Sequence, residues 1–187
     1  MNVKIYDFDK TIYDGDSSID FFIFCLKKKF IIIMYLPKFL IYVLLYKLKI
    51  KTKEMMKEQY FSFLKSFSNI DSIIEEFWEL NKRKIKRFYL EKKHDNDIII
   101  SASPMFLLAP ICKELDVMDL IATNVDKKTG KFKSKNCYGN EKVNRFISKY
   151  PNTNVIEVYS DSLSDLPLFN ISKKKFLVKG DNITEIK

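Results

Sequence analysis

The sequence predicts an α/β fold: a Rossmann-like core with a parallel sheet and an inserted all-helical domain. Three observations predict it. An apolar strand pattern at residues 3–6 runs into two aspartates, residues 17–92 carry only helical patterns, and strand and helix patterns alternate from residue 98 onward. Such alternation is typical of parallel strands joined by crossover helices. The first strand therefore belongs to the sheet, and the helical block is inserted after it.

The expected domains follow from this order. Residues 1–16 and 95–187 form the core, and residues 17–94 form the helical domain. A chain of 187 residues with 47% hydrophobic side chains can bury a core and still carry a smaller inserted domain.

The helical block has one unusual segment. Helices are expected at 18–29, 52–68 and 70–90, but residues 30–46 are apolar on all sides except at Pro37-Lys38. Three alternatives stay open for 30–46: a buried helical hairpin, an interfacial or re-entrant hairpin with its lysines on anionic headgroups, or a membrane span. A proline and a charge in the middle disfavour the span.

The second half supplies the rest of the sheet. The apolar run at 98–100 is typical of a strand that is buried on both faces. The remaining expected elements are helices at 105–115, 141–150 and 163–169, strands at 120–123, 155–159 and 176–178, and a small hairpin at 126–133.

Composition narrows the partners and the compartment. The net charge of +9 comes mostly from lysine, which attracts anions in general, but no base-stacking pattern accompanies it. We therefore expect no specific nucleic-acid binding. Three widely spaced cysteines and an N-terminus without a signal-peptide pattern predict a reducing, cytoplasmic location. Contact of residues 27–53 with the cytoplasmic face of an anionic membrane stays open as an addition to this.

Polar residues gather where the predicted strands end. Two carboxylates one residue apart require a cation when both ionise, and hard oxygen ligands suit Mg²⁺. Hydroxyls and amide groups at helix starts, together with a lysine, bind the oxygens of an anion. The residues are Asp7 and Asp9, then Ser101, then Lys142 at a helix start, and then Asp161 and Asp165. The set is typical of a site that handles phosphate.

These motifs resemble those of the haloacid dehalogenase superfamily of phosphohydrolases. The resemblance rests on Asp-x-Asp-x-Thr at 7–11, the apolar run ending in Ser101, Lys142, and Asp-x-x-x-Asp at 161–165. The helical insertion after the first motif resembles the C1 cap of subfamily IB, to which phosphoserine phosphatases belong. The resemblance implies a Rossmann-like core, a phosphatase activity and Mg²⁺ as cofactor.

It also implies roles for the first motif. Asp7 is implied as the nucleophile that forms an aspartyl-phosphate, and Asp9 as the acid that protonates the leaving group and then activates water. Thr11 would orient Asp9 or its loop and belongs to the phosphate-binding set.

The other motifs are implied to complete the site. Ser101 and the amides of Ala102 and Ser103 would hold phosphate oxygens, and Lys142 would neutralise charge. Mg²⁺ would bind Asp7, the carbonyl of Asp9 and Asp161, while Asp165 would support Lys142 or a metal-bound water.

Three further residues have simpler readings. Ser103 precedes a proline and is expected as a helix N-cap. His94 lies in a polar loop and is expected at the surface. Cys137 precedes Gly139 and is a weaker candidate for lining the pocket.

The substrate is the open question. No arginine occurs between Thr11 and Lys82, and only Asp16 matches a glutamate of the phosphoserine phosphatases, so phosphoserine is disfavoured. A second set of features includes the lysine-bracketed apolar run with its central proline, Ser103-Pro104, Gly139-x-Glu141-Lys142-Val143, Tyr159-Ser160-Asp161-Ser162 and Pro167-Leu168. In these features the chain is more similar to the bacterial group that contains phosphatidylglycerophosphatase C, which implies a lipid phosphate. A soluble small-metabolite phosphatase is the alternative. More remote are an inactive membrane-binding or partner-binding protein and transfer of the phosphoryl group to an acceptor other than water.

Overall fold

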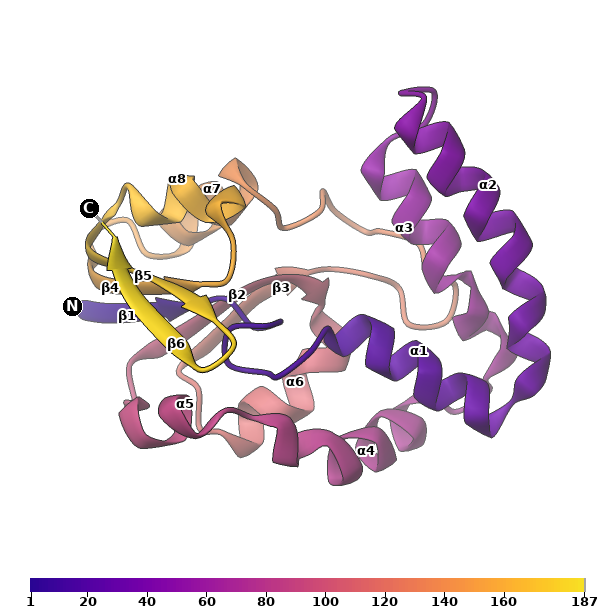
Figure 1. The fold of residues 1–187 in the computed structure, drawn as a ribbon, viewed down its shortest axis with the longest axis horizontal. Coiled ribbons are helices and arrows are strands. Elements are labelled where there is room, and N and C mark those ends of the chain that lie inside the picture. Colours follow the sequence, from indigo (N-terminus) through magenta and orange to yellow (C-terminus); the bar gives the residue numbers. More distant parts are fainter. Residues whose placement is uncertain (187) are drawn as a thin grey trace.

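The computed structural model describes residues 1–186 and contains one six-stranded sheet with the order β3-β2-β1-β4-β5-β6 (Figure 1). The first five strands are parallel, as predicted, and β6 pairs antiparallel with β5. The strands are β1 (Asn2–Tyr6), β2 (Asp97–Pro104), β3 (Asp119–Thr123), β4 (Asn154–Ser160), β5 (Ser172–Lys179) and β6 (Asn182–Ile186). The edge strand β6 was not predicted.

The segment from residue 17 to residue 92 contains only helices, as predicted, and we call it the helical insertion. Its elements, with η for a 3-10 helix, are α1 (Ser17–Lys28), η1 (Phe30–Tyr35), α2 (Leu36–Lys47), α3 (Lys53–Phe61), η2 (Ser62–Ser66), α4 (Ile70–Asn81), η3 (Lys82–Lys84) and α5 (Arg87–Lys92). The core helices are α6 (Met105–Glu114), α7 (Asn140–Lys149), η4 (Leu163–Asp165) and α8 (Leu166–Phe169).

Helices cover both faces of the sheet, with α7 and α8 on one side and α5 and α6 on the other (Figure 1). Successive side chains of β1 point to opposite faces of the sheet and pack in two different apolar clusters. Val3 and Ile5 pack in the cluster that contains Phe146 of α7. Tyr6 packs in the other cluster, where its ring lies 5.0 Å from that of Tyr89 in α5.

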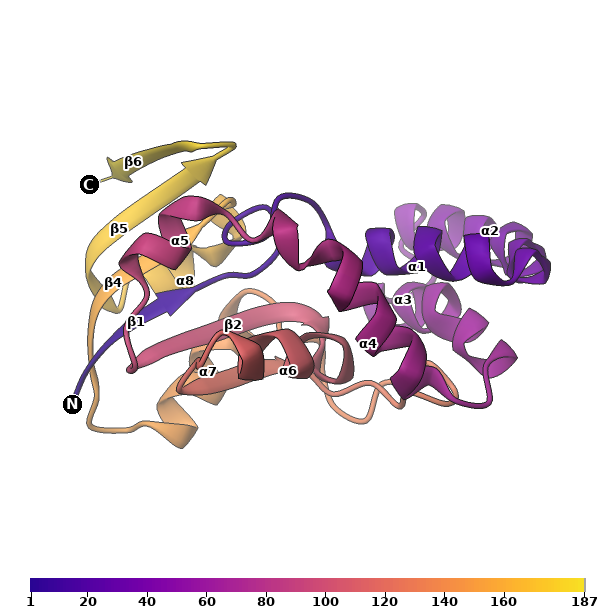
Figure 2. The same ribbon diagram turned by 90° about the horizontal axis from the view of Figure 1, so that it is seen from below.

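The helical insertion has two parts. Helices α1, α2 and α3 form a lobe at one end of the molecule, α5 lies over the sheet, and α4 extends from α6 out to α1 (Figure 2). Trp78 of α4 donates from Nε1 to the carbonyl of Leu107 in α6, at 2.6 Å. A large part of 17–94 therefore packs on the core, and the division of the chain at residues 16/17 and 94/95 stays a prediction.

Two local predictions were wrong in detail, and a third holds in reduced form. Residues 30–46 form η1 and α2, and no residue of α2 is buried, so the buried-hairpin alternative is wrong. The small hairpin predicted at 126–133 is present only as a turn closed by one antiparallel bridge, from Val125 to Phe132. The expected helix at 163–169 divides into η4 and α8, because Pro167 begins a new helical turn.

Candidate active site

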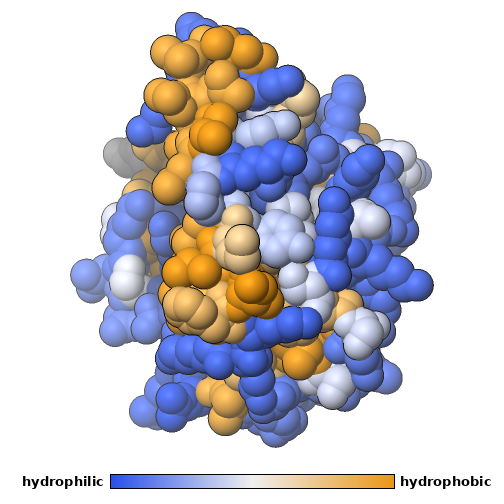
Figure 3. Space-filling view, turned by 90° about the vertical axis from the view of Figure 1, so that its right-hand side faces the viewer, coloured by the Kyte–Doolittle hydropathy of each residue, from blue (hydrophilic) through white to orange (hydrophobic). Residues whose placement is uncertain are grey.

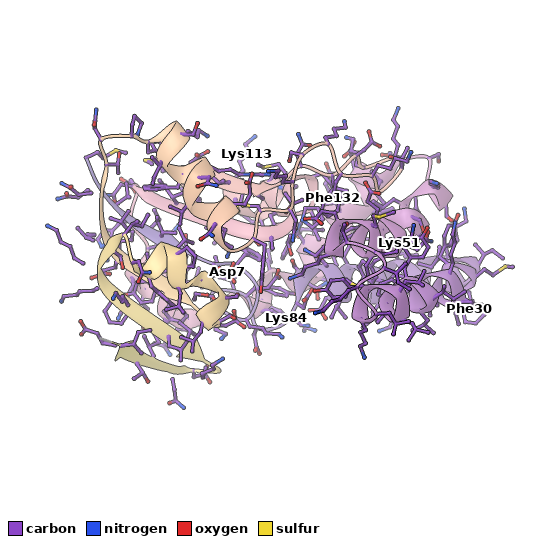
Figure 4. The ribbon with its side chains drawn as sticks, turned by 90° about the horizontal axis from the view of Figure 1, so that it is seen from above. Asp7, Phe30, Lys51, Lys84, Lys113 and Phe132 are labelled. Carbon is purple, nitrogen blue, oxygen red and sulfur yellow. The ribbon has the colours of Figure 1, made fainter. Side chains whose placement is uncertain are left out.

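The site lies where β1, β2 and β4 end. The amide of Asp7 donates to the carbonyl of Tyr159 in β4 at 2.9 Å, which continues the parallel pairing and fixes the direction of the Asp7 side chain. Figure 4 places Asp7 in the middle of the molecule, between the sheet and the α1–α3 lobe. A cavity of about 170 Å³ opens there, lined by Asp7, Asp9, Lys10, Asp16, Ser101, Ala102, Tyr138, Lys142, Asp161, Ser162, Ser164 and Asp165.

Lys142 joins the first and last motifs. Gly139, in a positive-φ conformation (57°), begins α7 and directs the first turn of this helix toward the cavity. Lys142 Nζ lies 2.7 Å from Asp7 Oδ1 and 2.7 Å from Asp165 Oδ2. All three side chains are almost completely buried. Ser160 also donates to Asp165, at 2.7 Å, so Asp165 holds the lysine in place.

Burial and charge act against each other in this trio. Loss of solvent alone would lower the pKa of Lys142, but the carboxylates of Asp7 and Asp165 raise it on balance. Burial raises the pKa of Asp7, and the neighbouring Lys142 opposes that rise. The lysine therefore stays charged and favours the ionised form of Asp7, which is the form that can act as a nucleophile.

Asp9 is held by the start of the helical insertion. Its Oδ1 accepts from the amide of Ser17 at 2.6 Å, and its Oδ2 accepts from Ser103 Oγ at 2.5 Å. Burial and the nearby charge of Asp16 raise the pKa of Asp9. A raised pKa suits a carboxyl group that must donate a proton near neutral pH.

The structure gives Ser103 a different role from the one expected. Ser103 lies inside β2, and α6 begins after Pro104 without a side-chain cap, so the N-cap prediction for Ser103 is wrong. Instead Ser103 holds Asp9, and its amide donates to Ser101 Oγ at 3.1 Å. Ser101 and Ala102 line the cavity as predicted residues of the phosphate site.

Thr11, unlike most of the predicted site residues, does not line this cavity. It is fully buried, and its amide donates to the carbonyl of Phe8 at 3.3 Å. No partner for its Oγ1 is present among residues 1–186. Its position fits a role in shaping the loop between Asp7 and Asp9 and does not bring the hydroxyl to the substrate.

The donors for a metal ion are two carboxylates and one carbonyl. Within the described residues, Asp7 Oδ2 and the carboxylate of Asp161 accept no hydrogen bond, although both residues face the cavity. Burial raises the pKa of Asp161, and a bound cation would oppose that rise by favouring the ionised carboxylate. Within residues 1–186, no three His, Cys, Asp or Glu side chains are placed so that they could hold one metal ion, but Mg²⁺ commonly uses only one or two carboxylates. The residues therefore fit Mg²⁺.

A second cavity, of about 360 Å³, adjoins the first and has a different character. It shares Asp9, Asp16 and Ala102 with the first cavity. Its other walls are mostly apolar and come from the helical insertion, with Ile19 of α1, Phe39 of α2 and Tyr60 of α3 among them. The charged first cavity therefore lies next to a mostly apolar second cavity.

Lys57 was missed by the sequence analysis. It extends from α3 into the second cavity, where Nζ donates to the carbonyl of Ala102 and to Asn136 Oδ1, both at 3.1 Å. Burial and the neighbouring Lys53 lower its pKa to about 8. No local signal distinguishes it from the many other lysines of this sequence.

Two minor expectations have clear outcomes. His94 is exposed, as predicted. Cys137 is fully buried in the apolar layer and does not line either cavity, so a pocket-lining role is wrong for this residue. Burial raises the pKa of its thiol to about 11, which makes it unreactive.

The fold and the site define a Rossmann-like α/β hydrolase whose acidic residues meet at the ends of parallel strands. Residues 5–170 match the sequence model of the haloacid dehalogenase-like hydrolases, and the chain belongs to this family. The predicted family and fold are thereby confirmed. No curated protein matched the chain.

Solved structures show the same fold at low sequence identity. A protein of unknown function from Bordetella pertussis Tohama I has a TM-score of 0.76 and 18% identity, over 93% of this chain and 88% of that one. A phosphoserine phosphohydrolase-like protein from Francisella tularensis subsp. tularensis SCHU S4 has a TM-score of 0.59 and 17% identity, over 94% and 86%. An apo phosphoserine phosphatase has a TM-score of 0.57 and 15% identity, over 92% and 84%.

Proposed function

We propose that the protein is a Mg²⁺-dependent phosphatase that hydrolyses phosphomonoesters through an aspartyl-phosphate on Asp7. The observation that carries this proposal is the contact of Asp7 with the buried Lys142, at 2.7 Å, in a cavity that Ser101 and Asp161 also line. One oxygen of Asp7 is bound by the lysine, and the other is free of hydrogen bonds from residues 1–186. This leaves a nucleophile beside groups that can neutralise a phosphoryl group.

The reaction runs in two steps. An Asp7 oxygen bonds to phosphorus while the bond from phosphorus to the leaving oxygen breaks, and Asp9 gives its proton to that oxygen. Water then attacks phosphorus, Asp9 takes its proton, and Asp7 is regenerated as phosphate leaves. The raised pKa of Asp9 suits the first step. Bound at Asp7, Asp161 and the Asp9 carbonyl, Mg²⁺ would supply a positive charge for the phosphoryl oxygens.

The activity is tested with p-nitrophenyl phosphate. We expect hydrolysis that needs Mg²⁺ and that disappears in Asp7→Asn, while Asp14→Asn, which changes an exposed aspartate of the same loop, keeps it. Mass spectrometry of acid-quenched protein should show one added phosphoryl group. Full activity in Asp7→Asn would contradict the proposed nucleophile.

For the substrate, we propose a lipid phosphomonoester. The apolar cavity beside the catalytic one supports this, because a leaving group attached to an acyl chain could bury that chain against Phe39 and Tyr60. Such a substrate, phosphatidylglycerophosphate for example, would have to be taken from a membrane surface. We place the protein in the cytoplasm, in contact with that surface.

A soluble anionic metabolite is the second candidate, favoured by Lys57. A lysine at the wall of the cavity can pair with a carboxylate, and several solved structures with this fold are phosphoserine phosphatases. The values of kcat/KM for lysophosphatidate in detergent micelles and for phosphoserine decide between the two. A preference for phosphoserine would contradict the lipid proposal and leave the phosphatase proposal intact.

A further inference from the structure

The surface formed by η1 and α2 is apolar and uncovered. No residue of α2 is buried, and many large apolar side chains of this segment are more than half exposed. They include Phe30 at 72%, Met34 at 70%, and Leu40, Ile41, Leu44 and Leu48 at 57–62%. Figure 3 shows these apolar side chains gathered on the end of the molecule that η1 and α2 form. An apolar face of this kind marks a surface that binds a partner.

The same segment carries one sign of charge. Residues 27–53 contain eight lysines, at 27, 28, 29, 38, 47, 49, 51 and 53, and no acidic residue. Lys38, Lys47 and Lys49 are exposed and form no ion pair within residues 1–186. At the N-terminal end of the segment, Lys28 pairs with Glu76 and Lys29 donates to the carbonyl of Ser66. Apolar side chains with free lysines beside them complement a surface that has an apolar interior and an anionic outer layer.

The lysines and apolar side chains of this surface favour one of its possible partners over the others. A second copy of the chain would bring the same lysines against each other, which disfavours self-association through this face. A membrane span would have to pull α2 away from the lobe. The ring of Phe39 lies 5.1 Å from that of Tyr60 in α3, and Ile32 of η1 is fully buried.

We propose that η1 and α2 dock the protein on an anionic lipid bilayer, with α2 lying along the surface. Leu40 and Leu44 lie in one row of α2, four residues apart, and Leu48 follows directly after the end of the helix. These three exposed side chains enter the acyl region. The lysines at both ends of the segment contact the headgroups. Residues at the opposite side of the lobe stay in water.

Docking in this way deepens the proposed function. Phe39 forms part of the wall of the apolar cavity, while its neighbours Leu40 and Ile41 are exposed on the docking surface. One helix thus separates the membrane from the substrate cavity. The origin of the substrate in the bilayer rests on the proposed function, but the docking itself does not.

The test is flotation of the full chain with vesicles of phosphatidylcholine alone or with one-third phosphatidylglycerol. We expect binding to the anionic vesicles that weakens in high salt, and much weaker binding to the neutral ones. The double substitution Ile41→Gln and Leu44→Gln should weaken binding at least about tenfold, because it removes two apolar side chains from the interface. Leu80→Gln with Leu90→Gln, at exposed positions of α4 and α5, is the matched control and should bind as the wild type does.

Folding and catalysis are followed separately. Circular dichroism should be unchanged in both double variants, and so should hydrolysis of p-nitrophenyl phosphate. Asp7→Asn should bind vesicles normally, so a failed phosphatase assay leaves the docking result valid. The proposal is overturned if the chain binds neither vesicle, if Ile41→Gln with Leu44→Gln binds normally, or if sedimentation shows a dimer that this double variant dissolves.

Discussion

Lys142→Met keeps the length of a buried side chain but removes the charge that lies between Asp7 and Asp165. In the wild type both carboxylates contact Nζ at 2.7 Å, and none of the three side chains is more than 11% exposed. Removing one partner of a buried ion pair costs about 3–5 kcal/mol. Asp7 keeps some contact with solvent, so we expect a loss near the lower end of this range, about 3 kcal/mol at pH 8.

The loss should depend on pH with a definite sign. Without the lysine, burial and repulsion from Asp165 raise the folded-state pKa of Asp7 further above its unfolded value. A carboxyl group of this kind favours the folded state at low pH, and that contribution disappears as the pH rises. The deficit of the variant should therefore shrink below pH 8, by about 1.4 kcal/mol per unit while the folded variant holds one extra proton.

The assay is urea unfolding from pH 5 to pH 8, in buffer with a chelator, together with hydrolysis of p-nitrophenyl phosphate in Mg²⁺. We expect the variant to lose activity by about 10²–10³-fold, as when one donor to a developing anion is removed. Lys149→Met, on the same helix but half exposed and paired with Asp119, is the control and should cost less than about 1 kcal/mol. A deficit that is equal at pH 5 and pH 8, or activity within threefold of wild type, would refute the reasoning.

Four other substitutions have expected effects on activity or stability. Asp9→Asn should lower kcat by about 10²–10⁴-fold, and Ser103→Ala by much less, because the serine only holds Asp9 (steady-state kinetics). Burial raises the pKa of Asp97 to about 6, so its protonated form favours the folded state at low pH, and this contribution is lost as the pH rises toward 6. Asp97→Asn should therefore stabilise the protein by about 1–2 kcal/mol at pH 8 but not at pH 4, as measured by urea unfolding. Gly130→Ala would bring a Cβ within 2.4 Å of the Phe61 carbonyl and should cost more than about 1 kcal/mol in thermal unfolding; equal stability of wild type and variant would contradict this.

The sequence predicted those site residues that lie at or near the carboxyl ends of the parallel strands. Asp7, Ser101 and Asp161 come directly after apolar runs, and parallel strands bring such positions to one edge of the sheet. Lys142 was predicted through its motif, and its Nζ lies 2.7 Å from Asp7 Oδ1. Order along the chain was therefore enough to place the catalytic residues together.

The parts that were not predicted depend on packing between distant segments. Lys57 reaches Ala102 only because of the way α3 lies over the sheet end, and no pattern within α3 encodes that position. Ser103 contacts Asp9 across 94 residues of sequence. The edge strand β6 was missed because its isoleucines, Ile183 and Ile186, fall on opposite faces, so the alternation of a half-buried strand is absent.

The central position of β1 affects how the chain must fold. This strand is synthesised long before its partner strands, since Lys4 pairs with Asp97 and Asn2 with Asn154. Contacts between such distant residues slow folding, because a long loop must close before they form. During synthesis β1 would wait, with apolar side chains and unpaired edges exposed, until most of the chain has left the ribosome. The strand that ends just before the proposed nucleophile is thus among the last to gain its neighbours, and folding and the assembly of the active site are completed together.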